Sequence, residues 1–236
     1  LATKARQRMD DEDPNAEGLS RRYIIAECEQ SLKRLQTDHI DLYQLHRPMS
    51  SIPIDETLRA LDDLVRAGKV RYIGTSNFAA WQMMESIWVS KELGLNRFVS
   101  TQPPYNLMDR RPERELVPMC ITYGIGIITW APLAGGFLTG KYKRGESAPS
   151  DARHAQRFVD TTDALFSERA FDVVETLERI GSEKGFSPSQ IALAWCRSQP
   201  GITAPIIGPR TMEHLVDNLG SLEIELNKAN KKKKKF

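Results

Sequence analysis

Short apolar segments alternate with longer segments of mixed polarity along the chain. Segments such as HIDLYQL at 39–45 are brief and rich in branched and aromatic residues, which predicts strands. Longer segments repeat apolar residues at helical spacing, as Leu58, Leu61 and Leu64 do. The expected strands span residues 1–4, 39–45, 70–75, 98–101, 125–129 and 202–207. The expected helices span residues 20–36, 55–67, 79–93, 111–123, 167–184, 188–198 and 211–219.

Residues at the ends of several expected helices support these boundaries. Ser20 and Thr211 stand where a side-chain oxygen caps a helix, and Ser187-Pro188 combines a cap with a first-turn proline. Gly68 and Gly94 follow two helices at positions that favour glycine. Residues 131–166 form a long connection, and connections of that length in compact domains are usually functional.

Strands that alternate with helices predict a parallel α/β sheet. Both an open doubly wound sheet and a closed (β/α)8 TIM barrel fit this order. The barrel is favoured, because residues suited to chemistry follow every strand instead of gathering near one switch point. Six strands are expected, so the sequence predicts a barrel with about six βα units whose first two strands precede this chain. It also predicts one domain over 1–226 and a basic, disordered tail over 227–236.

Polar or aromatic residues end each apolar segment, and parallel β/α folds place their chemistry at the carboxyl ends of strands. The residues at these ends are Lys4, His46, Asn77, Gln102, Trp130 and Arg210. His46 at a barrel mouth is a candidate catalytic residue, and its alternative is a structural histidine. Lys4 is either a solvated surface group or a cation that lowers the pKa of a neighbour.

The remaining strand-end residues suggest the parts of one ligand. Ser76, Asn77 and Gln102 suit a carboxamide, although residues of these types also form turns. Trp130 can stack on a flat ring or pack in the core. Arg210 precedes a helix start, where an anionic phosphate is favoured, and its alternative is a surface arginine. A planar carboxamide ring joined to phosphates describes a nicotinamide dinucleotide.

Two nucleotide-binding motifs can be set aside. The segment GGFLTGKY at 135–142 nearly matches a phosphate-binding P-loop, but Tyr142 replaces the hydroxyl that binds magnesium and no helix is expected behind it. Lys141 in this glycine-rich loop still suits a cofactor phosphate. No G-x-G-x-x-G motif occurs, so a Rossmann site is not supported.

Composition and charge exclude other classes of function. The net charge of +2 includes Lys231–Lys235, and the remaining 28 basic residues face 31 acidic ones, which argues against nucleic-acid binding. No apolar stretch approaches the ~20 residues that span a bilayer, and no signal peptide opens the chain. Cys28, Cys120 and Cys196 lack metal or redox spacing, and no metal site is expected. Buried reduced thiols predict a cytoplasmic protein.

Several segments, in this order, resemble the aldo-keto reductases. The matching segments are LATK (1–4), SLKRLQTDHIDLYQLHRP (31–48), GKVRYIGTSNF (68–78), QPPYNL (102–107), ITWAPLAGGFLTGKY (128–142) and SPSQIALAWCRSQPGITAPIIGPRTMEHLVDNL (187–219). The pattern is most similar to the branch that contains aryl-alcohol reductases and potassium-channel β subunits. The resemblance implies a (β/α)8 barrel that binds NADP(H) and reduces aldehydes or ketones to alcohols.

The resemblance also assigns roles to residues. Lys4 and His46 match two members of a catalytic Asp-Tyr-Lys-His tetrad, and the Asp and Tyr are expected upstream of Leu1. The residues matching the cofactor site are Ser76, Asn77, Gln102, Trp130, Pro132, Leu133, Gly135, Lys141, Gly208, Arg210, Thr211, His214, Asp217 and Asn218. His214 replaces the usual Gln and Asp217 the usual Glu. Arg153 is a further, loosely aligned candidate on the adenosine side.

The resemblance leaves three functions open. The first is a reductase of small carbonyl compounds, although turnover by a chain with half the tetrad is in doubt. The second is a non-catalytic NADP(H)-binding regulatory subunit, against which His46 argues because the similar channel subunits carry an amide there. The third is an inactive fragment. Neither nucleic acid nor a membrane is expected as a partner, and the carbonyl substrate and the oligomeric state stay open.

Overall fold

The computed structural model describes residues 1–149 and 166–226. Their contacts divide the chain into two compact units, which we describe separately. The first unit comprises residues 1–103 and 115–127, and the second comprises 104–114 and the chain from 128 onward. The expectation of one domain over 1–226 stays a prediction. The expected tail at 227–236 and Arg153 lie outside the described residues.

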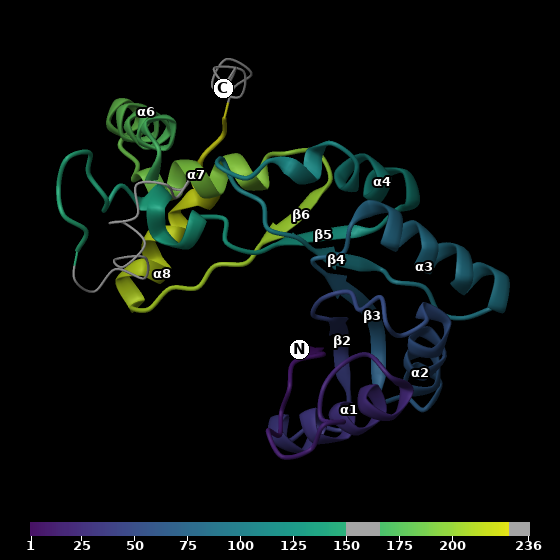
Figure 1. The fold of residues 1–236 in the computed structure, drawn as a ribbon. Helices are drawn as coiled ribbons and strands as arrows, with labels where there is room; N and C mark the ends of the chain where they lie inside the picture. Colours follow the sequence, from purple (N-terminus) through teal and green to yellow (C-terminus); the bar gives the residue numbers. More distant parts are fainter. Residues whose placement is uncertain (150–165, 227–236) are drawn as a thin grey trace. The chain divides into compact units, whose positions relative to one another are not determined.

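The first unit is built from strands and covering helices. Its strands are β1 (Ala2–Ala5), β2 (Ile40–Leu45), β3 (Val70–Ser76), β4 (Ser100–Gln102) and the start of β5 (Gly126–Thr129). Each strand pairs in parallel with the next. The helices are α1 (Arg21–Leu35), α2 (Ile54–Arg66), α3 (Ala80–Leu93) and α4 (Leu116–Tyr123). Helix α2 packs between α1 and α3, so these three helices lie side by side next to the strands (Figure 1).

The strand register gives this sheet two different faces. Lys4 lies opposite Gln44, Gln44 opposite Gly74, and Gly74 opposite Ser100, so these positions share one face. The other face packs on the helices, where Tyr43 donates its hydroxyl hydrogen bond to the Ile24 carbonyl of α1 at 3.3 Å. The helices therefore cover the face away from Lys4 and Gln44.

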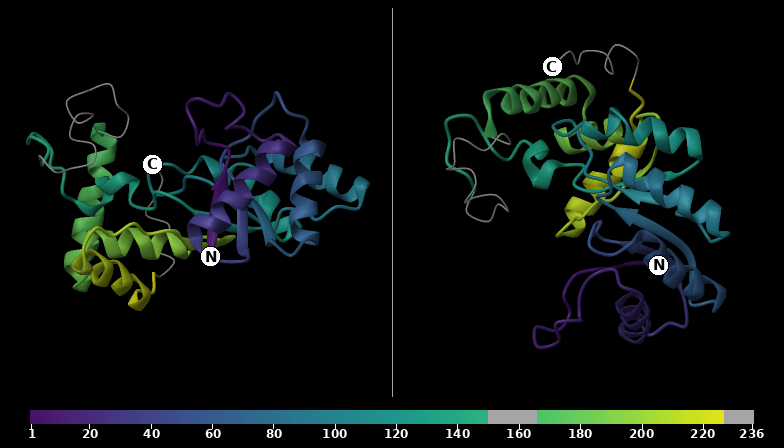
Figure 2. Two further views of the ribbon diagram at one scale, coloured as in Figure 1. Left: turned by 90° about the horizontal axis from the view of Figure 1, so that it is seen from below. Right: turned by 45° about the vertical axis from the view of Figure 1, so that its right-hand side comes forward.

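The second unit contains the remaining elements. They are η1 (Arg111–Glu113), the end of β5, η2 (Ala134–Thr139), α6 (Glu168–Lys184), α7 (Pro188–Arg197), β6 (Ile202–Pro205), α8 (Met212–Leu219) and η4 (Gly220–Glu223). Helix α7 contacts both α6 and α8 (Figure 2). Phe137, Tyr142 and Trp195 are among the largest side chains fully buried here. Helix α7 is thus the centre of this unit's core.

The strands lie in the order β1-β2-β3-β4-β5-β6, which is also their order in the sequence. A doubly wound sheet reverses its order at a switch point, whereas a (β/α)8 barrel adds each strand beside the previous one. The described residues contain six strands of such a fold. The barrel class predicted from the sequence is confirmed. Among the described helices, none combines the length and apolar composition needed to cross a bilayer.

Most predicted helix ends are confirmed, and some element boundaries are wrong. Ser20, Ser187 and Thr211 each accept a backbone N–H bond at the start of a helix. Gly68 and Gly94 follow α2 and α3 with left-handed φ values of 74° and 64°, as predicted.

The expected helix 111–123 is two elements, η1 and α4, because Glu115 has φ −138° and leaves the helical region. The expected strand 202–207 ends at Pro205, so Arg210 lies five residues beyond the strand, just before α8. The 131–166 connection contains η2.

Candidate functional site

The first unit brings Lys4 and His46 together at the carboxyl ends of β1 and β2. His46 follows β2 directly, and its backbone N–H donates to the Ala5 carbonyl of β1 at 3.0 Å. Burial lowers the pKa of His46, and the positive charges of Lys4, Arg47 and Arg6 lower it further. Burial also lowers the pKa of Lys4. The imidazole is therefore favoured in its neutral form, which donates one hydrogen bond and accepts another.

Ser76, Asn77 and Gln102 form one hydrogen-bonded turn at the ends of β3 and β4. The Ser76 hydroxyl donates to the Gln102 carbonyl at 2.8 Å, and Asn77 Nδ2 donates to Ser76 Oγ at 2.9 Å. Asn77 has φ 61°, a left-handed conformation that asparagine tolerates better than most residues. The structure thus brings the three predicted carboxamide-binding residues together and gives them the turn chemistry that was their alternative role.

Gln44 belongs to this cluster and was missed by the sequence reasoning. Gln102 Nε2 donates to Gln44 Oε1 at 3.2 Å, and both side chains are buried. This bond fixes which way the Gln102 amide points. A glutamine within the apolar segment HIDLYQL, two residues before His46, was the available signal.

A cavity of about 510 Å³ lies wholly within the second unit. Its size falls in the range of small-molecule sites. The predicted cofactor residues that line it are Trp130, Pro132, Leu133, Gly135, Lys141, Gly208, Arg210, His214, Asp217 and Asn218. Residues from the two ends of this unit's sequence therefore meet around one pocket.

The glycine-rich loop gives this pocket a wall of exposed backbone. Gly135 and Gly136 have φ 65° and 99°, which only glycine adopts without strain. A β-carbon at Gly136 would lie 3.2 Å from Lys141 Nζ, so the lysine side chain passes directly over the loop. The residues after Lys141 form turns up to 149 and no helix, which agrees with the rejection of a P-loop.

The opposite segment of the pocket comes from the start of α8. Thr211 Oγ1 accepts the His214 backbone N–H at 3.2 Å and so caps the helix, whose amino end favours an anion. Lys141, Arg210 and His214 add basic side chains to the lining. Asp217 Oδ2 accepts a hydrogen bond from the Ser187 hydroxyl at 3.1 Å, which ties α8 to the start of α7. This arrangement can bind phosphate groups.

Comparison with known proteins identifies the family of this chain. The profile of the aldo/keto reductase family matches residues 1–233. The chain belongs to the aldo/keto reductase family.

Named relatives of this aldo/keto reductase chain differ in their described roles. This chain is 38% identical over 213 residues to a probable voltage-gated potassium channel subunit beta of Oryza sativa subsp. japonica, and the match covers 89% of this chain and 65% of that protein. It is 39% identical over 231 residues to an uncharacterized oxidoreductase, YrpG, of Bacillus subtilis, covering 97% and 68%. A versiconal hemiacetal acetate reductase of Aspergillus parasiticus is 33% identical over 212 residues, covering 90% and 61%. The chain thus spans about two thirds of these relatives' lengths.

The lining of the pocket in this aldo/keto reductase overlaps only in part with the residues that the resemblance assigns to the cofactor. Thr211 is not among the pocket-lining residues, and its hydroxyl caps α8. The lining residues that sequence reasoning missed are Ala131, Gly136, Thr139, Ser189, Ile206, Ile207 and Pro209. All lie inside the segments that carried the resemblance, so their position beside predicted residues was the available signal.

Two tyrosines of the first unit, Tyr43 and Tyr72, lie within strands β2 and β3. The Tyr43 hydroxyl bonds to Ile24 on the helix side of the sheet, and burial raises its pKa far above the ordinary value. Tyr72 is within β3, as the sequence predicted. The three cysteines are free and buried, also as predicted.

Proposed function

We propose that this aldo/keto reductase chain binds NADP(H) and takes part in the reduction of aldehydes or ketones to alcohols. The observation that carries the proposal is the second unit's pocket, which combines the Trp130 ring with Lys141, Arg210 and His214. A flat ring surface and a set of basic groups are the two requirements of a nicotinamide dinucleotide. The family resemblance assigns its carboxamide to Ser76, Asn77 and Gln102.

The residues of the pocket fit the chemistry of this cofactor. Phosphates favour a helix amino terminus and backbone that no side chain covers. The start of α8 supplies the first, and Gly135 with Gly136 supplies the second. Arg210 directly precedes the α8 cap and suits the additional 2′-phosphate that distinguishes NADP(H) from NAD(H).

NADP(H), when bound, supplies the hydride that reduces a carbonyl carbon. Neutral His46 is suited to donate a hydrogen bond to the carbonyl oxygen, where negative charge develops. Lys4, in its charged form, stabilises negative charge beside it. A positioned proton donor contributes about 10²–10⁴-fold to such reactions. The Tyr43 hydroxyl lies on the helix side of the sheet and does not take that role, so turnover is measured separately from cofactor binding.

The test is a titration of the chain with NADPH and NADH, followed by nucleotide fluorescence. We expect Arg210→Ala to weaken NADPH binding at least about tenfold, as loss of a charged phosphate contact does, and to change NADH binding less than about twofold. The control is Arg179→Ala, because Arg179 lies on α6, pairs with Glu183 and does not line the pocket. An equal loss for the two nucleotides would contradict the 2′-phosphate role.

A second function is a non-catalytic NADP(H)-binding regulatory subunit, which the similarity to a probable channel β subunit favours. Cofactor binding supports both functions, so turnover distinguishes them. Single-turnover oxidation of NADPH by a panel of small aldehydes, abolished by His46→Ala, supports the reductase. Binding without any turnover supports the subunit, and binding of neither nucleotide supports an inactive fragment. We place the chain in the cytoplasm, with a small carbonyl compound as its partner.

A further inference from the structure

Asn106 lies next to the pocket-lining segment 130–132 and uses both ends of its side-chain amide in hydrogen bonds. It is 5% exposed, and its Nδ2 donates to the Ala131 carbonyl at 2.9 Å. Its Oδ1 accepts the backbone N–H groups of Met108 and Asp109 at 2.8 and 2.9 Å. The amide oxygen therefore stabilises Asn106's own loop, whereas the amide nitrogen binds segment 130–132. Asn106 itself does not line the pocket.

Segment 130–132, to which Asn106 donates, contains a strained residue, Ala131. Ala131 has φ 52°, a left-handed conformation that costs a residue with a β-carbon free energy. Such conformations persist where surrounding contacts impose them. The Trp130 carbonyl, one residue earlier, accepts the Tyr105 backbone N–H at 3.3 Å. The carbonyls of Trp130 and Ala131 thus accept hydrogen bonds from two consecutive residues of one loop, Tyr105 and Asn106.

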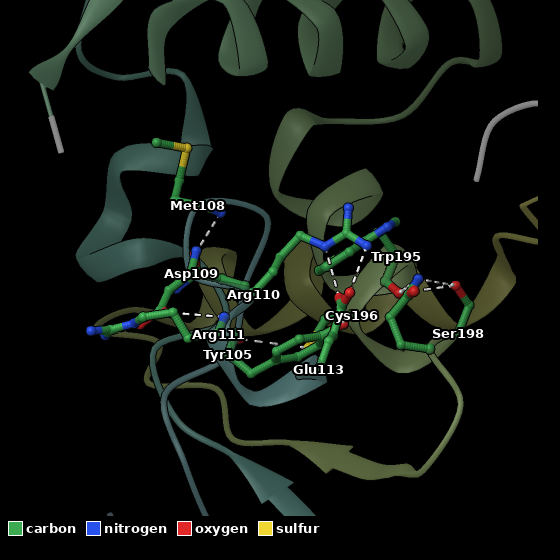
Figure 3. Close-up of polar contacts among 11 residues, drawn as sticks. Tyr105, Met108, Asp109, Arg110, Arg111, Glu113, Trp195, Cys196 and Ser198 are labelled. Carbon is green, nitrogen blue, oxygen red and sulfur yellow. Dashed lines mark hydrogen bonds and ion pairs between the residues drawn. The ribbon is translucent and has the colours of Figure 1, made fainter. Parts of the chain in front are cut away.

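That loop is itself anchored by a polar and aromatic network. The Tyr105 hydroxyl donates to Glu113 Oε1 at 2.6 Å, and Arg110 donates to both Glu113 oxygens at 2.7 and 2.8 Å (Figure 3). The Tyr105 ring stacks on Trp195 of α7 with centroids 5.4 Å apart, and Arg110 lies 5.4 Å from the same ring. These contacts fix the loop on the buried core, and the loop in turn holds segment 130–132 in place.

We propose that Asn106 is a positioning residue for the nucleotide, because its bond to Ala131 sets the turn that presents the Trp130 ring to the pocket. This inference rests on the proposed function. Trp130, Ala131 and Pro132 line the pocket in succession. Without the bond, the turn relaxes from its left-handed conformation and the ring moves. The phosphate and adenosine contacts of the α8 side do not depend on it.

The test separates the two ends of the nucleotide. Asn106→Asp keeps the oxygen that accepts from Met108 and Asp109 and loses the donor to Ala131, whereas Asn106→Ala loses both. We expect each variant to weaken NADPH binding about tenfold, the weight of one buried hydrogen bond and a relaxed turn. Binding of 2′,5′-ADP, which lacks the nicotinamide end, should change less than about twofold.

Exposed Asn15→Asp controls for the added charge. Unchanged NADPH binding by Asn106→Asp would overturn the inference and leave the proposed function standing. Equal weakening of NADPH and 2′,5′-ADP would also overturn it, since general loss of structure has that effect. If the unaltered chain binds neither nucleotide, the proposed function fails and the inference fails with it.

Discussion

Asn77 donates a hydrogen bond from Nδ2 to the main-chain carbonyl oxygen of His46 at 2.9 Å. The two residues follow neighbouring strands, β3 and β2, which pair in parallel up to Leu45 and Thr75. The bond therefore continues the sheet by one more contact beyond the last strand pair. A residue assigned to the cofactor thus also holds the backbone of the candidate catalytic histidine.

The conformation of Asn77 predicts an unusual order of stability among its variants. Asn77→Gly loses the side-chain bonds to His46 and Ser76, each worth about 1 kcal/mol, but keeps the left-handed backbone without strain. Asn77→Ala loses the same bonds and adds about 1–2 kcal/mol of strain at φ 61°. Urea unfolding should rank the native chain above Asn77→Gly and Asn77→Ala last. Alanine more stable than glycine, the usual order, would contradict this.

Gly74 predicts a steric effect at the centre of the sheet. A β-carbon there would lie 2.6 Å from Ser100 Oγ and 3.1 Å from the Ser100 carbonyl oxygen. We expect Gly74→Ala to lower the free energy of unfolding by about 1–3 kcal/mol, as overpacking does. Ser100 Oγ is buried and has no hydrogen-bond partner among the described residues. Ser100→Ala should therefore cost little alone and recover part of the loss in the double variant. Additive losses would contradict a clash with the hydroxyl.

The environment of His46 predicts how its pKa and the stability of the chain vary with pH. Burial comes first among the causes that lower its pKa, and Lys4 is the next. We expect NMR titration to place the His46 pKa below about 6.5 and Lys4→Met to raise it. Because the unfolded state then binds more protons between the two pKa values, the free energy of unfolding should fall as pH decreases through that window.

The matched measurement uses His46→Gln, which cannot titrate. Subtracting its unfolding free energies from those of the native chain isolates the contribution of the histidine. The difference, native chain minus His46→Gln, should be constant above about pH 7 and should decrease as the pH is lowered. A difference that stays flat across this range would show that the folded state does not disfavour the imidazolium.

Strand-end residues were predictable because chain order alone determines which end of a parallel strand carries the chemistry. Lys4, His46 and Asn77 follow from that rule. Gln44 and Asn106 do not, because their roles depend on register and on a loop conformation that puts Asn106 beside Ala131, 25 residues away. The helix break at Glu115 had no signal in apolar spacing. Thr211 has both a cap pattern and a family match, and its contact with the His214 backbone shows the cap.

Asp62 predicts a large effect far from the candidate site. Its side chain is 4% exposed and accepts bonds from the Asn96 backbone N–H and Nδ2, both at 2.8 Å, and from Arg66 Nε at 2.5 Å. Burial alone would raise its pKa, but the bonds from Asn96 and Arg66 outweigh burial and lower it. Its contribution to stability is therefore present above the unfolded value of about 3.9 and lost as pH falls through the folded value.

We expect Asp62→Asn to cost about 2–3 kcal/mol near neutral pH, because an amide replaces a carboxylate that accepts several bonds, one of them from an arginine. Asp63→Asn is the control, since Asp63 is half exposed and its pair with Arg21 should contribute less than about 1 kcal/mol. Chemical unfolding at a series of pH values measures both. The cost of Asp62→Asn should shrink in acid, where Asp62 is protonated in the folded state as well. A cost that persists unchanged there would assign the effect to shape and packing instead of charge.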